Sequence, residues 1–266
     1  VDMTCEGIGI TQDTNLLGNQ SNNTVIVQGE STTVKDAVYG GYVQNYDYGS
    51  GDVTVTGNTV TFNGGSGSHV FGGLGSGTSN GSGDVTVSGN SVTLNGSSNN
   101  YNVYGGLGLG YGSGDVTVTD NSVTLNGSSS GGDVYGGNVQ NYGDATVTGN
   151  SVTFNGSSSV SSSSVIGGFG QSDGDITVTG NSVTLNGSSS GRSVYGGSGI
   201  SHGSGDVTVT GNSVTFNDGS SGRSVYGGSG TSYGSGDVTV TGNTVNIHDN
   251  AKVTGNLYGA FIDDMS

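Results

Sequence analysis

The sequence lacks proline and tryptophan and contains one cysteine, Cys5, among its 266 residues. One cysteine cannot form a disulfide within the chain, so a disulfide-stabilised scaffold is excluded. The uninterrupted apolar runs are only a few residues long, whereas a membrane-spanning helix needs about 20. The sequence therefore indicates a soluble chain that is not inserted into a membrane.

Basic residues are also scarce. Four Lys and Arg side chains stand against 20 Asp and Glu, which gives a formal net charge of −16. Nucleic acids and anionic lipids are bound through clustered Lys and Arg, so neither is an expected partner. Such an acidic chain favours solubility and the binding of cations.

Apolar residues make up only 29% of the chain, and 57 residues are glycine. This composition is typical of disorder, because so little apolar surface cannot offset the entropy lost on folding. The apolar residues recur at a fixed interval, however, so each can be buried against its copy in the next unit. The repeat therefore predicts an ordered chain.

The repeat is clearest in the segment Gly-Asp-Val-Thr-Val-Thr-Gly-Asn at 51–58. A second run, Thr-Val-Thr-Phe-Asn at 59–63, follows it, and a third run ends each unit, as in Ser-Val-Tyr-Gly-Gly at 193–197. The aspartate of the first run recurs every 29 to 32 residues, at Asp52, Asp84, Asp115, Asp144, Asp175, Asp206 and Asp237.

Within a unit, Val53, Val55, Val60 and Phe62 alternate with threonines, which is typical of half-buried strands. About eight units of about 31 residues, each with three short strands, predict an all-β fold, a parallel β-helix or solenoid. A propeller is the rival, but its blades need about 40 residues and four strands. We expect residues 24–266 to form the solenoid repeats and residues 1–23 a degenerate N-terminal coil, cap or assembly segment.

Two asparagine columns should mark the corners of the coils. In a stacked coil, copies of one residue lie about 4.8 Å apart, so their amides can bond to one another. Asparagine also tolerates the left-handed backbone of a sharp corner. The corner between the first and second strands holds Asn58, Asn90, Asn121, Asn150, Asn181, Asn212 and Asn243. The next corner holds Asn63, Asn95, Asn126, Asn155, Asn186 and Asn217.

The repeated Val-Tyr-Gly-Gly followed by Gly-Asp-Val-Thr-Val-Thr-Gly-Asn-Thr-Val-Thr resembles the passenger repeats of bacterial autotransporter-type adhesins, over residues 24 to about 260. The resemblance implies a secreted protein at the bacterial cell surface that takes part in adhesion or biofilm cohesion. The family's membrane barrel does not follow Ser266. We expect that the barrel lies outside this sequence, or that the chain is a separate secreted subunit.

The aspartate column places carboxylates at coil spacing, where they repel one another. Backbone N–H groups in the Gly-rich turn can compensate this charge. A line of Ca²⁺ sites is the alternative, because oxygen atoms are the ligands that Ca²⁺ prefers. The nonapeptide period of Gly-rich calcium repeats is absent.

A Thr-x-Thr pattern in the first strand predicts an outward grid of hydroxyl and methyl groups. Threonine is a favoured residue on the solvent side of a strand. The grid also resembles the ice-binding face of β-solenoid antifreeze proteins. That alternative would use Thr54, Thr56, Thr117, Thr119, Thr146, Thr148, Thr177, Thr179, Thr208, Thr210, Thr239 and Thr241.

The third run contains an aromatic column. It is broken by Ile166 and comprises Tyr39, Phe71, Tyr104, Tyr135, Tyr195, Tyr226 and Tyr258. Stacked rings stabilise neighbouring coils, and exposed rings could dock glycans or host surfaces. Further tyrosines are expected in the variable loops, where binding specificity commonly resides: Tyr42, Tyr46, Tyr48, Tyr101, Tyr111, Tyr142 and Tyr233.

No catalytic constellation emerges, because His69, His202 and His248 occupy non-equivalent positions in different units. The expected function is therefore structural or adhesive and not enzymatic. The last unit reaches Leu257-Tyr258 without a charged helix or a Pro-rich cap, so we also expect self-association end to end into an extracellular filament.

Overall fold

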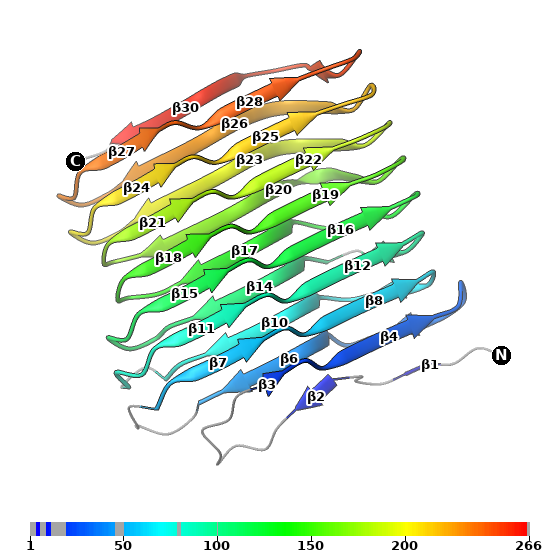
Figure 1. Cartoon of the computed structure of the whole chain (residues 1–266), viewed down its shortest axis with the longest axis horizontal. Coiled ribbons are helices and arrows are strands. Elements are labelled where there is room, and N and C mark those ends of the chain that lie inside the picture. The colour runs from blue at the N-terminus through cyan, green and yellow to red at the C-terminus, as the bar shows by residue number, and fades with distance from the viewer. Residues whose placement is uncertain are drawn as a thin grey trace.

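The computed structural model describes residues 4–5, 9–11, 20–45, 51–78, 81–99 and 101–264. All regular elements in these residues are strands, and every pair of neighbouring strands is parallel. Figure 1 shows the coils stacked one on another along the solenoid axis. The predicted parallel β-solenoid is confirmed.

The Val-Thr-Val-Thr runs form the first sheet. It has eight strands. They are β3 (Gln20–Ser21), β7 (Val53–Thr56), β11 (Val85–Ser88), β15 (Val116–Thr119), β18 (Ala145–Thr148), β21 (Ile176–Thr179), β24 (Val207–Thr210) and β27 (Val238–Thr241).

The following runs form the second sheet, which also has eight strands. They are β4 (Thr24–Gln28), β8 (Thr59–Asn63), β12 (Ser91–Asn95), β16 (Ser122–Asn126), β19 (Ser151–Phe154), β22 (Ser182–Leu185), β25 (Ser213–Phe216) and β28 (Thr244–Ile247).

The third runs form the long-strand sheet of ten strands. They are β2 (Gly9–Thr11), β6 (Val38–Gln44), β10 (Val70–Ser76), β14 (Val103–Leu109), β17 (Val134–Gln140), β20 (Ser159–Ser172), β23 (Ser190–Ser201), β26 (Ser221–Ser232), β29 (Lys252–Val253) and β30 (Leu257–Asp264). A short sheet precedes it in the early coils: β1 (Thr4–Cys5), β5 (Thr33–Val34), β9 (Ser66–Gly67) and β13 (Ser98–Asn99).

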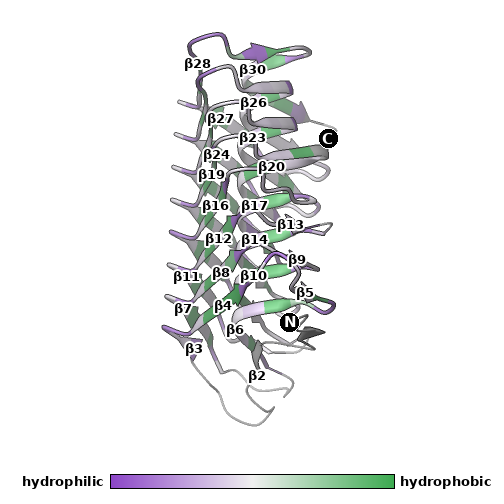
Figure 2. Cartoon of the chain, turned by 90° about the vertical axis from the view of Figure 1, so that its right-hand side faces the viewer, coloured by the Kyte–Doolittle hydropathy of each residue, from purple (hydrophilic) through white to green (hydrophobic). Residues whose placement is uncertain are grey.

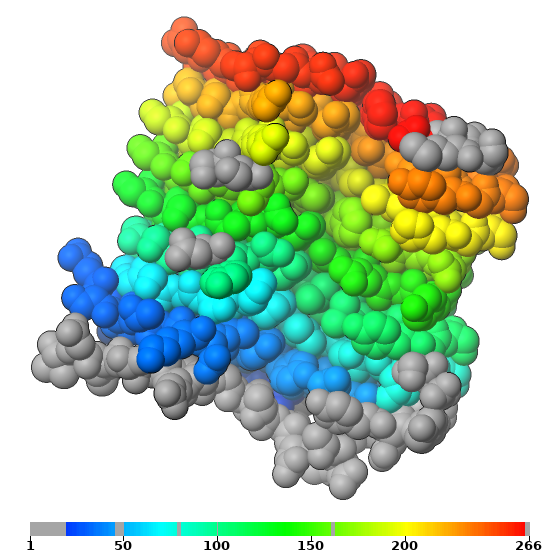
Figure 3. Space-filling model, turned by 180° about the vertical axis from the view of Figure 1, so that it is seen from behind, coloured from blue at the N-terminus to red at the C-terminus, as the bar shows by residue number. Residues whose placement is uncertain are grey.

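The third strand is longer than we expected from the sequence. In β20, β23 and β26 it covers 14, 12 and 12 residues, because the Ser/Gly segment before Val-Tyr-Gly-Gly also pairs with its copies. The long-strand sheet therefore forms one layer of a flattened coil, and the first and second sheets together form the other (Figure 2). Figure 3 shows the molecule from the side of the long strands.

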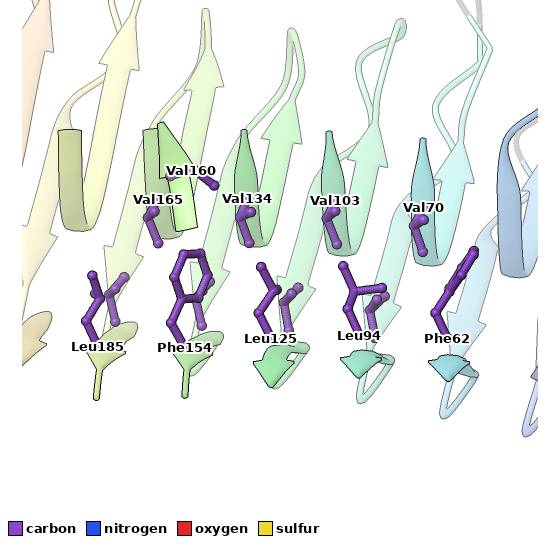
Figure 4. Close-up of a cluster of buried hydrophobic side chains, with 14 of the residues drawn as sticks. Phe62, Val70, Leu94, Val103, Leu125, Val134, Phe154, Val160, Val165 and Leu185 are labelled. Atoms are coloured by element: carbon purple, nitrogen blue, oxygen red, sulfur yellow. The ribbon is translucent and has the colours of Figure 1, made fainter. Parts of the chain in front are cut away.

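Two apolar clusters fill the space between the layers. One lies between the second sheet and the start of the long strands, where Phe62 and Leu94 face Val70 and Val103 (Figure 4). The other lies between the first sheet and the end of the long strands, and includes Val55. Alternation thus buries one face of the strands in the first and second sheets from β7 and β8 to β24 and β25, as the sequence predicts.

Reciprocal volume changes keep the second cluster packed. The long strands place Gly108, Val139 and Gly170 in register, and the first sheet places Val116, Ala145 and Ile176 in register. The larger Val139 thus occurs in the coil with the small Ala145, and the smaller Gly170 in the coil with the large Ile176. Volume-conserving exchanges of this kind are the ones that a close-packed core tolerates best.

Candidate functional surfaces

The first asparagine column, here called the inner ladder, lies between the two apolar clusters and is buried. Asn58, Asn90, Asn121, Asn150, Asn181 and Asn212 all have 0% exposure. The described residues also add Asn23, which sequence reasoning missed, because its backbone N and Nδ2 donate to Asn58 Oδ1 at 3.0 and 2.8 Å. The unit that contains Asn23 is degenerate, and only its position before Thr24-Val25 could have revealed it.

Asn90 shows the bonding of the inner ladder. Its Nδ2 donates to Asn121 Oδ1 at 2.9 Å and to the Val55 carbonyl oxygen at 3.1 Å. Its Oδ1 accepts the backbone N–H and the Nδ2 group of Asn58 at 3.0 and 2.9 Å. Two donors and two acceptor sites are the full capacity of an amide, so the buried side chain is satisfied.

The corner needs these amides because the polypeptide passes there from the first sheet to the second. The backbone N–H of the asparagine there donates to Oδ1 of the asparagine in the next coil, as from Asn90 to Asn121 at 2.9 Å, and the Val55 carbonyl oxygen accepts from Asn90 Nδ2. Buried backbone groups require such partners. The expected left-handed asparagine is wrong, however. The positive φ belongs to the residue before it, which is a glycine such as Gly149 (67°) or Gly180 (64°) or, in two coils, Asn22 (57°) and Asp120 (55°).

The Gly-Gly pair of each long strand packs against the inner ladder. A Cβ at Gly137 would lie 2.5 to 2.7 Å from three side-chain atoms of Asn150. A Cβ at Gly136 would lie 2.5 Å from the Gly167 carbonyl oxygen of the next coil. Both positions therefore require glycine for close approach, and neither requires it for a left-handed backbone.

The second asparagine column, the outer ladder, lies at the end of the second sheet and is exposed or half-buried. Each Nδ2 donates to Oδ1 of the preceding coil at 2.8 to 2.9 Å, as from Asn155 to Asn126. The bonds of the two ladders thus run in opposite directions along the axis.

The aspartate column is exposed, and its carboxylates accept backbone hydrogen bonds. The N–H of each aspartate donates to Oδ1 of the aspartate in the preceding coil, at 2.8 to 3.1 Å. These contacts place partial positive charge beside each carboxylate. Across the described residues, no three His, Cys, Asp or Glu side chains lie together as a metal would require.

The aromatic column stacks on the long-strand sheet. Successive centroids from Tyr39 through Phe71 and Tyr104 to Tyr135 are 5.0 Å apart, with interplanar angles of 7°, 0° and 5°. Beyond Ile166, stacking resumes from Tyr195 to Tyr226 at 4.5 Å. The tyrosine rings of the column are half-buried and Phe71 is buried. Burial raises the pKa of the Tyr135 hydroxyl.

The threonine grid lies on the outer side of the first sheet, where its side chains are half-buried. Thr86, Thr117 and Thr146 are in register, and so are Ser88, Thr119 and Thr148. The second sheet continues the pattern with Thr93, Thr124 and Thr153. Four hydroxyl-bearing columns, those of Thr54, Thr56, Thr59 and Thr61, therefore run along one layer.

The tyrosines expected in loops divide into three groups. Tyr42 was wrongly assigned, because it lies inside β6 and stacks on Tyr39 at 5.0 Å. Tyr46 and Tyr48 lie outside the described residues. The others, at 45% to 59% exposure, are Tyr101, Tyr111, Tyr142 and Tyr233.

Three of these exposed tyrosines share the edge where the long strands turn toward the first sheet, on the left in Figure 1. There His202 stacks on Tyr233, with centroids 5.1 Å apart and an angle of 2°. The column along this edge reads Tyr111, Tyr142, Asp173, His202 and Tyr233. Sequence reasoning missed this grouping, because the turns differ in length; the 29-residue interval before Asp144 was the available signal.

No family model, curated protein or solved structure matches this chain. Among the residues that the structure describes, no helix is long and apolar enough to cross a membrane.

Proposed function

We propose that this chain is a structural and adhesive solenoid at the surface of a bacterium, and that copies stack end to end into an extracellular filament. The near-identical coils and the resemblance of their repeats to adhesin passengers support a structural role over a catalytic one. The acidic, Gly-rich composition is consistent with an extracellular location.

The last described coil carries the proposal of stacking. Phe216 and Val225 are fully buried, whereas their registered partners Ile247 and Leu257 are 40% and 49% exposed. Ile262, in the same coil, is 50% exposed. Open strand edges with apolar side chains favour pairing with another chain.

The inner ladder supports a second copy as the proposed occupant of this end. Its amide donors point along the axis from Asn23 toward Asn243. Within the described residues, the ladder thus runs from Asn23 near one end of a copy to Asn243 near the other, with every amide donor on the same side. Head-to-tail stacking continues this polarity, whereas head-to-head stacking would oppose donors to donors.

Electron microscopy of the purified chain tests stacking. We expect filaments with an axial repeat of about 40 Å, since eight coils are about 4.8 Å apart. Ile247→Asp should abolish the filaments because it places a charge in the apolar contact, and the neighbouring His248→Asp should retain them. Monodisperse monomers of the unsubstituted chain at high concentration would contradict stacking.

Ice binding is the second candidate function, favoured by the four hydroxyl-bearing columns in register. Their spacing is about 4.8 Å along the axis and roughly 6.6 Å along the strands, which is regular enough to order water. Thr148→Tyr should abolish inhibition of ice recrystallisation, whereas Ser224→Tyr, on the other layer, should not. An unsubstituted chain without inhibition would eliminate this candidate.

A further inference from the structure

The turns from the long strands to the first sheet differ in length, and the difference is confined to one part of the edge. Between registered strand positions, the turns at 110–115 and 201–206 contain six residues. Those at 141–144 and 172–175 contain four. Two short turns thus lie in adjacent coils, with a longer turn on each side.

A hollow of about 310 Å³ lies at these two short turns. It extends over four coils, about 14 Å at a coil spacing of about 4.8 Å, and its volume falls at the lower end of the range for ligand sites. The side chains that matter for recognition are Tyr111, Gln140, Tyr142, Gln171, Asp173 and His202.

The lining combines exposed rings with hydrogen-bonding groups. Tyr111 and Tyr142 are 45% and 59% exposed, so their apolar ring faces are in water. Gln140, Gln171 and Asp173 contribute amide donors, amide acceptors and a carboxylate. The stack on Tyr233 holds the His202 ring in place at one end.

Asn141 adds a buried polar atom to this lining. The side chain is 7% exposed, and its Nδ2 donates to the carbonyl oxygens of Gly114 and Asp144 at 3.2 and 2.8 Å. Its Oδ1 has no hydrogen-bond partner among the described residues. A buried amide oxygen without a partner is rare in folded proteins, and this one lies against Gly110, which also lines the hollow.

We propose that this hollow binds a neutral oligosaccharide. A pyranose ring has an apolar C–H face that packs on a tyrosine ring, and hydroxyl groups that bond to amides and carboxylates. The elongated hollow accommodates several linked rings in preference to a single sugar. Asp173 and the net charge of −16 disfavour acidic sugars. This inference rests on the adhesive part of the proposed function.

Two variants and a control separate recognition from folding. Tyr142→Ala removes an exposed ring. Insertion of Ser-Gly between Gly143 and Asp144 removes no side chain, but it lengthens this turn to the six residues found at 110–115. Tyr101→Ala is the matched control, because Tyr101 is 54% exposed, against 59% for Tyr142, and does not line the hollow.

Isothermal titration of the full chain with cellohexaose, mannohexaose and chitohexaose, and with an oligogalacturonate as acidic probe, tests the proposal. We expect at least one neutral probe to bind. Tyr142→Ala and the insertion should weaken that binding by about tenfold or more, and Tyr101→Ala by less than about twofold. Unchanged circular dichroism melting shows that the variants are folded.

The proposal is overturned if no neutral probe binds, if the acidic probe binds more tightly, or if Tyr142→Ala and Tyr101→Ala have equal effects. If the chain forms filaments but binds no oligosaccharide, the proposed binding site is wrong and the proposed stacking is supported. If the chain stays monomeric and binds an oligosaccharide through Tyr142, the binding site is supported and the proposed stacking is wrong.

Discussion

The inner and outer asparagine ladders use the same residue at the same interval in opposite environments. Asn150 is fully buried, with its amide capacity filled. Asn155, in the same coil, is half-buried and shares single amide bonds with its neighbours. Repetition in the sequence therefore shows that residues stack, but it does not show how much the stack contributes to the stability of the fold. That contribution depends on whether water can replace the lost bonds.

The largest expected effect is from Asn150→Asp, which breaks the inner ladder without changing its shape. The substitution removes both side-chain donors and places a carboxylate in a buried site with no basic partner. We expect the free energy of unfolding to fall by about 4 kcal/mol or more, which is enough to prevent folding if the protein is only marginally stable. Chemical denaturation measures the change, and a loss below about 1 kcal/mol would refute the assigned role.

Gly137→Ala tests the partner of the inner ladder on the opposite layer. The added Cβ would collide with Asn150, and close-packed layers cannot separate without loss elsewhere. A loss of about 2 to 3 kcal/mol is expected. Thermal denaturation should show a lower Tm, whereas an unchanged Tm would mean that the layers do not meet at this position.

Gly170→Val tests whether side-chain volume in the second apolar cluster is shared between the long strand and the first sheet. The preceding coil pairs the larger Val139 with the small Ala145, whereas this coil pairs Gly170 with Ile176. Alone, Gly170→Val should destabilise by about 1 to 3 kcal/mol, because Ile176 occupies the space. With Ile176→Ala it reproduces Val139 and Ala145. The double variant should then be more stable than Ile176→Ala alone by about 1 kcal/mol, measured as a double-mutant cycle. Strict additivity would argue against contact between the two positions.

The smallest expected effect is from Asn155→Ala in the outer ladder. Water can bond to the amides of Asn126 and Asn186 that lose their partner, so we expect a loss of about 0.5 to 1 kcal/mol. A loss as large as that of Asn150→Asp would remove the distinction between the ladders.

The stacking of coils could be predicted from the sequence because period-2 alternation and a fixed interval are local patterns. The contact of Gly137 with Asn150 could not be, because it depends on how two layers face each other across the coil. The left-handed corner residue was misassigned because both glycine and asparagine accept that backbone. The hollow beside Tyr142 could not be predicted either. It forms where two short turns occur in adjacent coils, and the repeat pattern does not show the shape of the turns.

Hydrogen exchange of the asparagine side-chain amides, measured by NMR on protein labelled at asparagine, tests the central distinction most directly. The account predicts slow exchange for the amides of the inner ladder, since their opening requires the core to open, and fast exchange for those of the outer ladder. Equal exchange rates for Asn150 and Asn155 would contradict it.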